Sequence, residues 1–273
     1  MPLGRRSGWR EVGRDVYVRN YRTLDENVGL ILGDGAAMLV DTRSSHVQGA
    51  EILRHVREVT PLRPTVVVNT HCHFDHCYGN AVMLPCEIWG HEACAFELRT
   101  NGEARRRDVL ATVSPAMARE IETVEIVPPD HEVRDHRTIR VGGRAVELRH
   151  VGRGHTDGDL VAVVADAHVL FAGDLVEEGA PPSFGDAFPL DWPATAGHVA
   201  ALASGPVVPG HGKVVDRAYV ERQAGELAAV AAQARAAHAQ GIPEDRAAKL
   251  LALPPAYAAD AIRRAYAQLD GAV

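Results

Sequence analysis

Alternating apolar and polar residues predict strands at the start of the chain. The pattern marks four strands, at residues 9–12, 16–21, 28–32 and 36–40. Gly33, Asp34 and Gly35 separate the last two strands and are typical of a hairpin turn. Apolar residues then recur at helical spacing through residues 46–59, with Ser44 or Ser45 as the candidate N-cap. We therefore expect a strand meander followed by a helix.

Helices predominate in the middle of the chain, and strands return after it. Short buried strands at 66–68 and 86–89 precede a charged, alanine-rich stretch, 91–123, that favours helices. Later strands are predicted at residues 133–141, 145–151, 160–164, 168–171 and 207–208, with a helix at 193–204. Residues 177–192 are too irregular for an element and too long for a simple connector, so we interpret them as a functional loop.

The last part of the chain has a different pattern. From Asp216 onward it is alanine-rich and helical, with breaks at residues 241–243 and 254–255. Val220, Leu227 and Ala234 recur every seven residues, a spacing that permits close approach of a helix to the chain's own body or to a second subunit. We therefore expect a domain at residues 1–215 and a helical C-terminal extension at 216–273, with a homodimer as the alternative packing.

Composition narrows the class of protein. With 273 residues and 46% hydrophobic residues the chain can bury a core, and its net charge of −7 argues against a nucleic-acid partner. No stretch is apolar for long enough to cross a membrane, and residues 1–7 carry positive charge without the apolar run of a secretory signal. Four cysteines without paired CxxC spacing suggest free thiols and a cytoplasmic location.

Directly after the strand at 66–68 the chain carries a cluster of metal-binding residue types. His71 and His73 are two residues apart, so an extended backbone directs both imidazoles to one side. Asp75 and His76 follow where the chain must turn, so they can face a second point. Imidazole and carboxylate together suit zinc and its neighbours. A histidine-rich surface loop is the alternative, but the position of the cluster after a buried strand favours a metal site.

Three more positions at strand ends can complete such a site. His155 lies in a glycine-rich turn, Asp174 ends a buried strand, and His211 lies in a tight turn. Each alone is weak evidence, but with the first cluster they make five histidines and two aspartates, enough for two ions. We assign His71, His73 and His155 to one metal, and Asp75, His76 and His211 to the other, with Asp174 bridging. This arrangement leaves room for a shared water.

The ordered set of His71, His73, Asp75, His76, His155, Asp174 and His211 resembles the metallo-β-lactamase-fold hydrolase superfamily. The resemblance covers about residues 15–215 and implies an α+β fold, an αββα sandwich of two mixed β-sheets with helices outside and metals at one edge. The aspartate at position 174 resembles the glyoxalase II, lactonase and phosphodiesterase branches of the superfamily. True β-lactamases of this fold have Cys or Ser at the corresponding position. Residues 155–160 and the helical tail look similar to zinc metallohydrolases related to the sulfur-oxidation and quinoprotein-relay groups.

The expected function is metal-dependent hydrolysis of a small ester, thioester, lactone, amide or phosphodiester. Two zinc ions would lower the pKa of a bridging water, and Asp75 is the catalytic candidate that orients this water or carries its proton. Iron or manganese would also suit these ligands. Two other classes remain open. The first is an iron-dependent persulfide dioxygenase, because residues 69–76 also resemble that group. The second hypothesis is a non-enzymatic metal-binding or partner-binding protein.

Several neighbours of the predicted site need an interpretation of their own. Cys72 points away from the ligands on an extended segment, so we expect it in the core, and we expect Glu177 to be solvated. His150 and His198 are candidates to support the ligands. Five aromatic residues are candidates for the wall of a substrate pocket, with packing of the loop as the alternative: Phe74, Tyr78, Phe184, Phe188 and Trp192.

Overall fold

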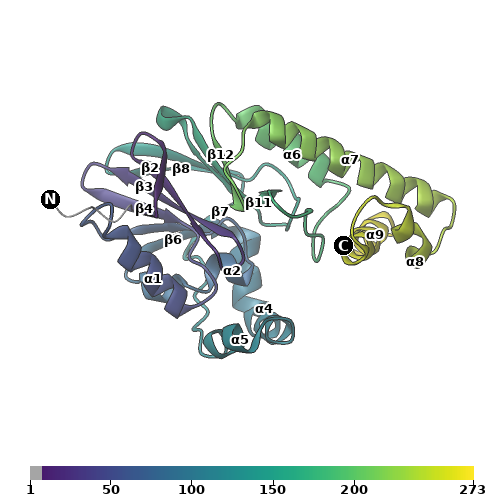
Figure 1. Cartoon of the computed structure of the whole chain (residues 1–273), viewed down its shortest axis with the longest axis horizontal. Coiled ribbons are helices and arrows are strands. Elements are labelled where there is room, and N and C mark those ends of the chain that lie inside the picture. Colours follow the sequence, from purple (N-terminus) through teal and green to yellow (C-terminus); the bar gives the residue numbers. More distant parts are fainter. Residues whose placement is uncertain (1–7) are drawn as a thin grey trace.

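The first half of the chain forms a mixed sheet in the computed structural model, which describes residues 8–273 (Figure 1). The expectation about a secretory signal concerns residues 1–7 and lies outside the described residues. The strands, in spatial order, are β1 (Arg10–Gly13), β2 (Val16–Tyr21), β3 (Glu26–Gly33), β4 (Ala36–Val40), β5 (Val66–Val68), β6 (Glu87–His91) and β7 (His131–Val133). Neighbours from β1 to β4 are antiparallel, and those from β4 to β7 are parallel.

The helices of this half connect the parallel strands. They are α1 (His46–Val56), α2 (Phe74–Cys77), α3 (Asn80–Met83), α4 (Glu92–Leu110) and α5 (Pro115–Ile121). Ser45 caps α1, because its side chain accepts a hydrogen bond from the Gln48 backbone amide, and Ser114 caps α5 in the same way. The N-cap predicted at Ser44 or Ser45 is therefore confirmed at Ser45.

The second half forms a second mixed sheet with its own helices. Its strands, in spatial order, are β12 (Val207–His211), β11 (Val169–Glu177), β10 (Val161–Val164), β9 (Arg144–Arg149) and β8 (His136–Val141). Its helices are η1 (Ala165–Ala167), α6 (Trp192–Leu202), α7 (Arg217–Ala239), α8 (Glu244–Ala247), η2 (Ala248–Leu250) and α9 (Pro255–Leu269). β11 and β12 are parallel, and the other neighbouring strands are antiparallel.

The two sheets pack face to face and meet at one edge. Ile31 and Val40 of the first sheet share a buried apolar cluster with Leu148 and Phe171 of the second. Helices α1 and α3 pack on the outer face of the first sheet, and α6, α7 and α9 on that of the second. The sheets are joined where His211 of β12 pairs with Glu26 of β3. The expected αββα sandwich is confirmed.

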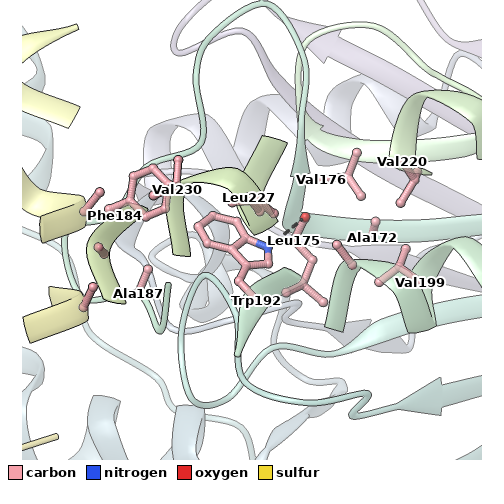
Figure 2. Close-up of a cluster of buried hydrophobic side chains, with 14 of the residues drawn as sticks. Ala172, Leu175, Val176, Phe184, Ala187, Trp192, Val199, Val220, Leu227 and Val230 are labelled. Atoms are coloured by element: carbon pink, nitrogen blue, oxygen red, sulfur yellow. Dashed lines mark hydrogen bonds between the residues drawn. The ribbon is translucent and has the colours of Figure 1, made fainter. Parts of the chain in front are cut away.

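Residues beyond 216 pack against the second sheet. Val220, Leu227 and Ala234 of α7, the residues of the seven-residue repeat, are buried in one cluster with Leu175 of β11. Figure 2 shows this cluster around Trp192, whose indole donates a hydrogen bond to the Leu175 carbonyl (3.1 Å). This face of α7 therefore contacts the chain's own body. Within residues 8–273, no helix combines the length and apolar character of a membrane span.

One predicted strand is divided between the two sheets. Residues 133–141 were expected to form one strand, but β7 ends at Val133 beside β6, and β8 begins at His136 beside β9. Residues 134–138 between the two buried ends are exposed, so the chain crosses here from one sheet to the other. Strand β11, in contrast, is longer than predicted. It continues to Glu177, beyond the expected end at residue 171, because each of its residues is buried.

Candidate metal centre

A change from strand to helix separates the two pairs of residues in the histidine cluster. His73 is the N-cap of the one-turn helix α2, so Asp75 and His76 lie in a helical turn while His71 precedes it. Two buried asparagines hold this turn: the Asn69 amide donates to Asn80 Oδ1 (3.0 Å), and the Asn80 amide donates to Asn69 Oδ1 (2.7 Å). The local fold therefore directs the four side chains toward two neighbouring points.

The structure brings all seven predicted ligand residues together. Their nitrogen and oxygen atoms form two groups, with the atoms of each group within 4.8 Å of one another. The first group contains His71, His73, His155 and Asp174, and the second contains Asp75, His76 and His211. Asp174 lies between them: its carboxylate is 3.4 Å from His155 Nε2, 3.3 Å from His76 Nε2 and 3.3 Å from His211 Nε2.

Three of the ring nitrogens that point away from the centre have acceptors. His76 Nδ1 lies 2.9 Å from the Asp41 carboxylate, and His211 Nδ1 lies 2.8 Å from the Leu24 carbonyl oxygen. His73 Nε2 lies 3.0 Å from Asp186. An acceptor outside requires a proton on that nitrogen, so in the neutral ring the other nitrogen points inward with its lone pair.

The ring nitrogens and carboxylate oxygens that point into the centre are not matched with hydrogen-bond donors. His73 Nδ1 and His155 Nε2 face each other at 2.9 Å, and His76 Nε2 and His211 Nε2 at 3.3 Å. Among the described residues, His71 Nε2 and Asp174 Oδ1 are buried without a hydrogen-bond partner. Converging lone pairs and orphaned acceptors are satisfied by cations. The donor set therefore fits divalent metal ions.

The protonation of the metal-free centre is uneven. Burial lowers the pKa of His211, but the Asp174 carboxylate outweighs burial and raises the pKa to about 10. Burial likewise opposes the charge on His73, yet Asp186 raises its pKa to about 9. Burial dominates at His155 and lowers its pKa to about 4. At neutral pH some of these histidines carry protons that an incoming metal must displace.

Several residues that support the centre were missed from the sequence. Asp41 accepts hydrogen bonds from the Thr70 amide (2.8 Å), the Thr70 hydroxyl (2.9 Å) and His76. It lies at the end of a buried strand parallel to β5, a position that could have indicated it. Asp186 lies in an irregular loop, where no pattern marks it. His150 and His198, which were expected to support the ligands, donate instead to the carbonyls of Asp159 and Val151.

Glu177 differs from the expectation of a solvated loop residue. It is buried at the end of β11, with Oε1 3.5 Å from His155 Nδ1, and accepts a hydrogen bond from the Ser183 amide (3.0 Å). Burial and the charge of Asp174 raise the pKa of Glu177 to about 8.

Cys72 packs with Tyr78 and other buried residues, and burial raises the pKa of its thiol. Its interpretation as a core residue is confirmed.

A cavity of about 800 Å³ opens in front of the centre. Phe74 and Tyr78 line it, as expected. Phe184, Phe188 and Trp192 were also expected there, but they are buried and do not line it. Phe184 and Trp192 belong to the cluster under helix α7 (Figure 2), and Phe188 lies beneath the guanidinium groups of Arg153 and Arg264. These three aromatic residues therefore pack the loop instead of contacting the cavity.

The arrangement of sheets and candidate ligands agrees with comparisons to known proteins. The family model of the Metallo-beta-lactamase superfamily matches residues 21–211. The chain belongs to this superfamily. That range contains every predicted ligand, and the match extends from the end of β2 to the end of β12.

Proteins similar to this chain have different activities in their names. The acyl-coenzyme A thioesterase MBLAC2 of Homo sapiens is 28% identical over 56% of this chain, which spans 59% of that protein's length. Metallo-beta-lactamase type 2 of Bacillus cereus is 26% identical over 69% of this chain and 68% of its own. The sec-alkylsulfatase Pisa1 from Pseudomonas sp. has a TM-score of 0.75 at 17% identity, covering 96% of this chain and 50% of that chain. The last likeness shows a shared fold.

Proposed function

We propose that this metallo-β-lactamase superfamily member is a hydrolase with two divalent metal ions. The observation that supports two ions is the position of Asp174, within 3.3–3.4 Å of histidine nitrogens from both ligand groups. His71, His73 and His155 would hold one ion, and Asp75, His76 and His211 the other, with Asp174 shared. Zinc suits this donor set best, and iron or manganese would also be accepted.

The metal pair would supply a nucleophilic hydroxide near neutral pH and polarise the bond to be cleaved. The chain's own residues hold the geometry for that step. Asp75 borders the cavity, with a carboxylate oxygen 3.5 Å from His211 Nε2, so it can orient the attacking water and accept its proton. Asp41, Asp186 and the Leu24 carbonyl can accept the outer N–H of three ligands, so that once the extra protons are displaced the inner nitrogen of each ring is the one free to bind a metal.

The walls of the cavity favour a substrate with an uncharged apolar group. Leu24, Phe74, Tyr78, Val109 and Tyr257 provide apolar surface. The exposed carboxylates at its border are those of Asp25 and Asp108, with Glu178 nearby.

Among the described residues of the cavity wall, no unpaired lysine or arginine is available to bind an anionic group of a substrate. Arg105 is the one arginine or lysine among the described residues that line the cavity. Its guanidinium is paired with Glu97 (2.6 Å) and Asp186 (2.9 Å). We therefore propose an ester or thioester with an uncharged acyl group as the substrate, and the name of the acyl-coenzyme A thioesterase MBLAC2 supports only the thioester bond.

Metal analysis combined with a substrate panel tests this function. The purified protein should hold two ions per chain and cleave short neutral acyl thioesters and esters faster than lactones, β-lactams or phosphodiesters. His73→Ala, with its metal content measured, is the inactive control. Oxygen consumption by a protein with one iron would instead identify a persulfide dioxygenase. Two bound metals without turnover of any substrate would favour the non-enzymatic class.

The organisation of the chain around this activity is also a proposal. We infer a metal-binding domain at residues 1–215 and a helical extension at 216–273, a division supported by the end of the family match at residue 211. Burial of Val220, Leu227 and Ala234 against the second sheet favours packing within one chain over a homodimer. The four free cysteines support a cytoplasmic location.

A further inference from the structure

An aspartate from the loop after β11 contacts one of the candidate ligands from outside. Both carboxylate oxygens of Asp186 lie near His73 Nε2, at 3.0 and 3.2 Å. The other ring nitrogen of His73 faces the centre, 2.9 Å from His155 Nε2. On its other side, Asp186 forms an ion pair with the Arg105 guanidinium of α4 at 2.9 Å. Asp186 therefore holds the outer edge of a ring whose inner edge faces the metal centre.

The C-terminal helix α9 holds the main chain on both sides of this contact. Arg264 donates to the carbonyl oxygens of Asp186 (2.8 Å) and Ala187 (2.7 Å). Arg263 donates to the Gly185 carbonyl oxygen at 2.7 Å. Residues 178–191 form an irregular loop, so three consecutive carbonyls anchored by one helix restrain where the Asp186 side chain can lie.

We propose that Asp186 is a positioning residue for His73, and that α9 keeps it in place through Arg264. A carboxylate that accepts the outer N–H of a ligating histidine sets its tautomer and orientation and increases its basicity. The inference depends on the proposed function only in that His73 is a metal ligand. The helical extension thereby contributes to metal binding without supplying a ligand, and Tyr257 of the same helix lines the cavity.

A purely structural role for Asp186 makes a different prediction. In that case the carboxylate would stabilise Arg105 and the loop, and its removal would act independently of His73. The two roles are separated by a double-mutant cycle, because a residue that acts through His73 has nothing to position once that side chain is removed. Metal binding by the metal-free chain is the readout, since it does not require that any substrate be known.

The experiment titrates Zn²⁺ into metal-free protein against a chromophoric chelator. Asp186→Ala should weaken one of the two binding steps by about 10- to 100-fold, the range for loss of a residue that orients a ligand. Asp186→Asn, which retains an acceptor oxygen, should recover part of the affinity, and Arg264→Ala should weaken the same step less. Co²⁺-substituted protein should show a changed ligand-field spectrum in the Asp186 variants.

Asp191→Asn is the matched control. Asp191 lies in the same loop and accepts from Arg153 (2.7 Å) and Gln268 (3.2 Å), but contacts none of the candidate ligands. Its substitution should leave both Zn²⁺ steps and the Co²⁺ spectrum unchanged.

Three results would overturn the proposal: wild-type Zn²⁺ affinity in Asp186→Ala, an equal loss in Asp191→Asn, or an undiminished effect of Asp186→Ala in a His73→Ala background. If Asp186→Ala does not fold, Asp186→Asn and Arg264→Ala decide by the same comparisons. Two tightly bound ions with no hydrolysis would refute the proposed function and leave this inference standing.

Discussion

Replacement of Asp41 by asparagine tests whether the metal centre depends on the tautomers of its histidines. Asp41 is buried and accepts three hydrogen bonds, from the Thr70 amide, the Thr70 hydroxyl and His76 Nδ1. Its backbone has a φ of 64°, a left-handed conformation in which asparagine and aspartate are both tolerated. Asp41→Asn therefore changes the charge and the hydrogen bonding while leaving the backbone preference nearly unchanged.

The expected loss of metal affinity in Asp41→Asn depends on which hydrogen-bond donors lose their acceptor. The amide oxygen of the new side chain can still accept from the Thr70 backbone N–H, which places its NH₂ group against His76 Nδ1. His76 must then carry its proton on Nε2, toward the metal, or leave Nδ1–H without an acceptor. A buried donor without a partner costs about 1–3 kcal/mol. Metal affinity at the group containing His76 should therefore fall by about 5- to 150-fold.

The assay is Zn²⁺ binding by metal-free protein, followed with a competing chelator, with thermal unfolding of the metal-free variant as a test of folding. Asp15→Asn is the control, because Asp15 also has a left-handed backbone (φ 58°) but is exposed in the turn between β1 and β2. It should bind both ions with wild-type affinity. Wild-type affinity at both steps in a folded Asp41→Asn protein would refute the tautomer argument.

Three other perturbations have expected outcomes. Asp174→Ala should bind fewer than two metals per chain by elemental analysis and lose most of its rate; two tightly held ions would show that Asp174 does not bridge. Trp192→Ala should lower the free energy of unfolding by about 3–5 kcal/mol in urea titrations, since the side chain is fully buried, and a smaller loss would contradict its place in the core. Metal-free protein should lose stability as pH rises from about 6.5 through the raised pKa values of His73 (about 9) and His211 (about 10), because folding favours their charged forms. A urea midpoint that does not fall between pH 7 and 10 would argue against these protonated states.

The sandwich was predictable from the sequence because most of its elements are locally encoded. Strand β2 and strand β4 match their predicted limits, since alternating or continuous apolar residues end at turn residues. The candidate ligands could be found for a related reason. His71 follows β5 and His211 ends β12, so strand ends marked by local pattern place them at one edge.

What the sequence did not predict depends on contacts between distant segments. Asp186 reaches His73 across 113 positions of the chain, and its loop has no periodicity that would show the direction of a side chain. For the same reason the aromatic residues of that loop could not be assigned to the cavity or to the core. Trp192 became a core residue because α7 covers it, and that packing is set by the C-terminal helices.

The division of candidate ligands between the two halves of the sandwich has a thermodynamic consequence. Residues 71–76 belong to the first half, whereas His155, Asp174 and His211 belong to the second. Ions held by both sets would act as a cross-link between the two sheets, in addition to their apolar contacts and the pairing of His211 with Glu26. At a free metal concentration 1,000-fold above its dissociation constant, each ion would add about 4 kcal/mol to folding stability. The melting temperature of this protein would then report the metal supply of its surroundings.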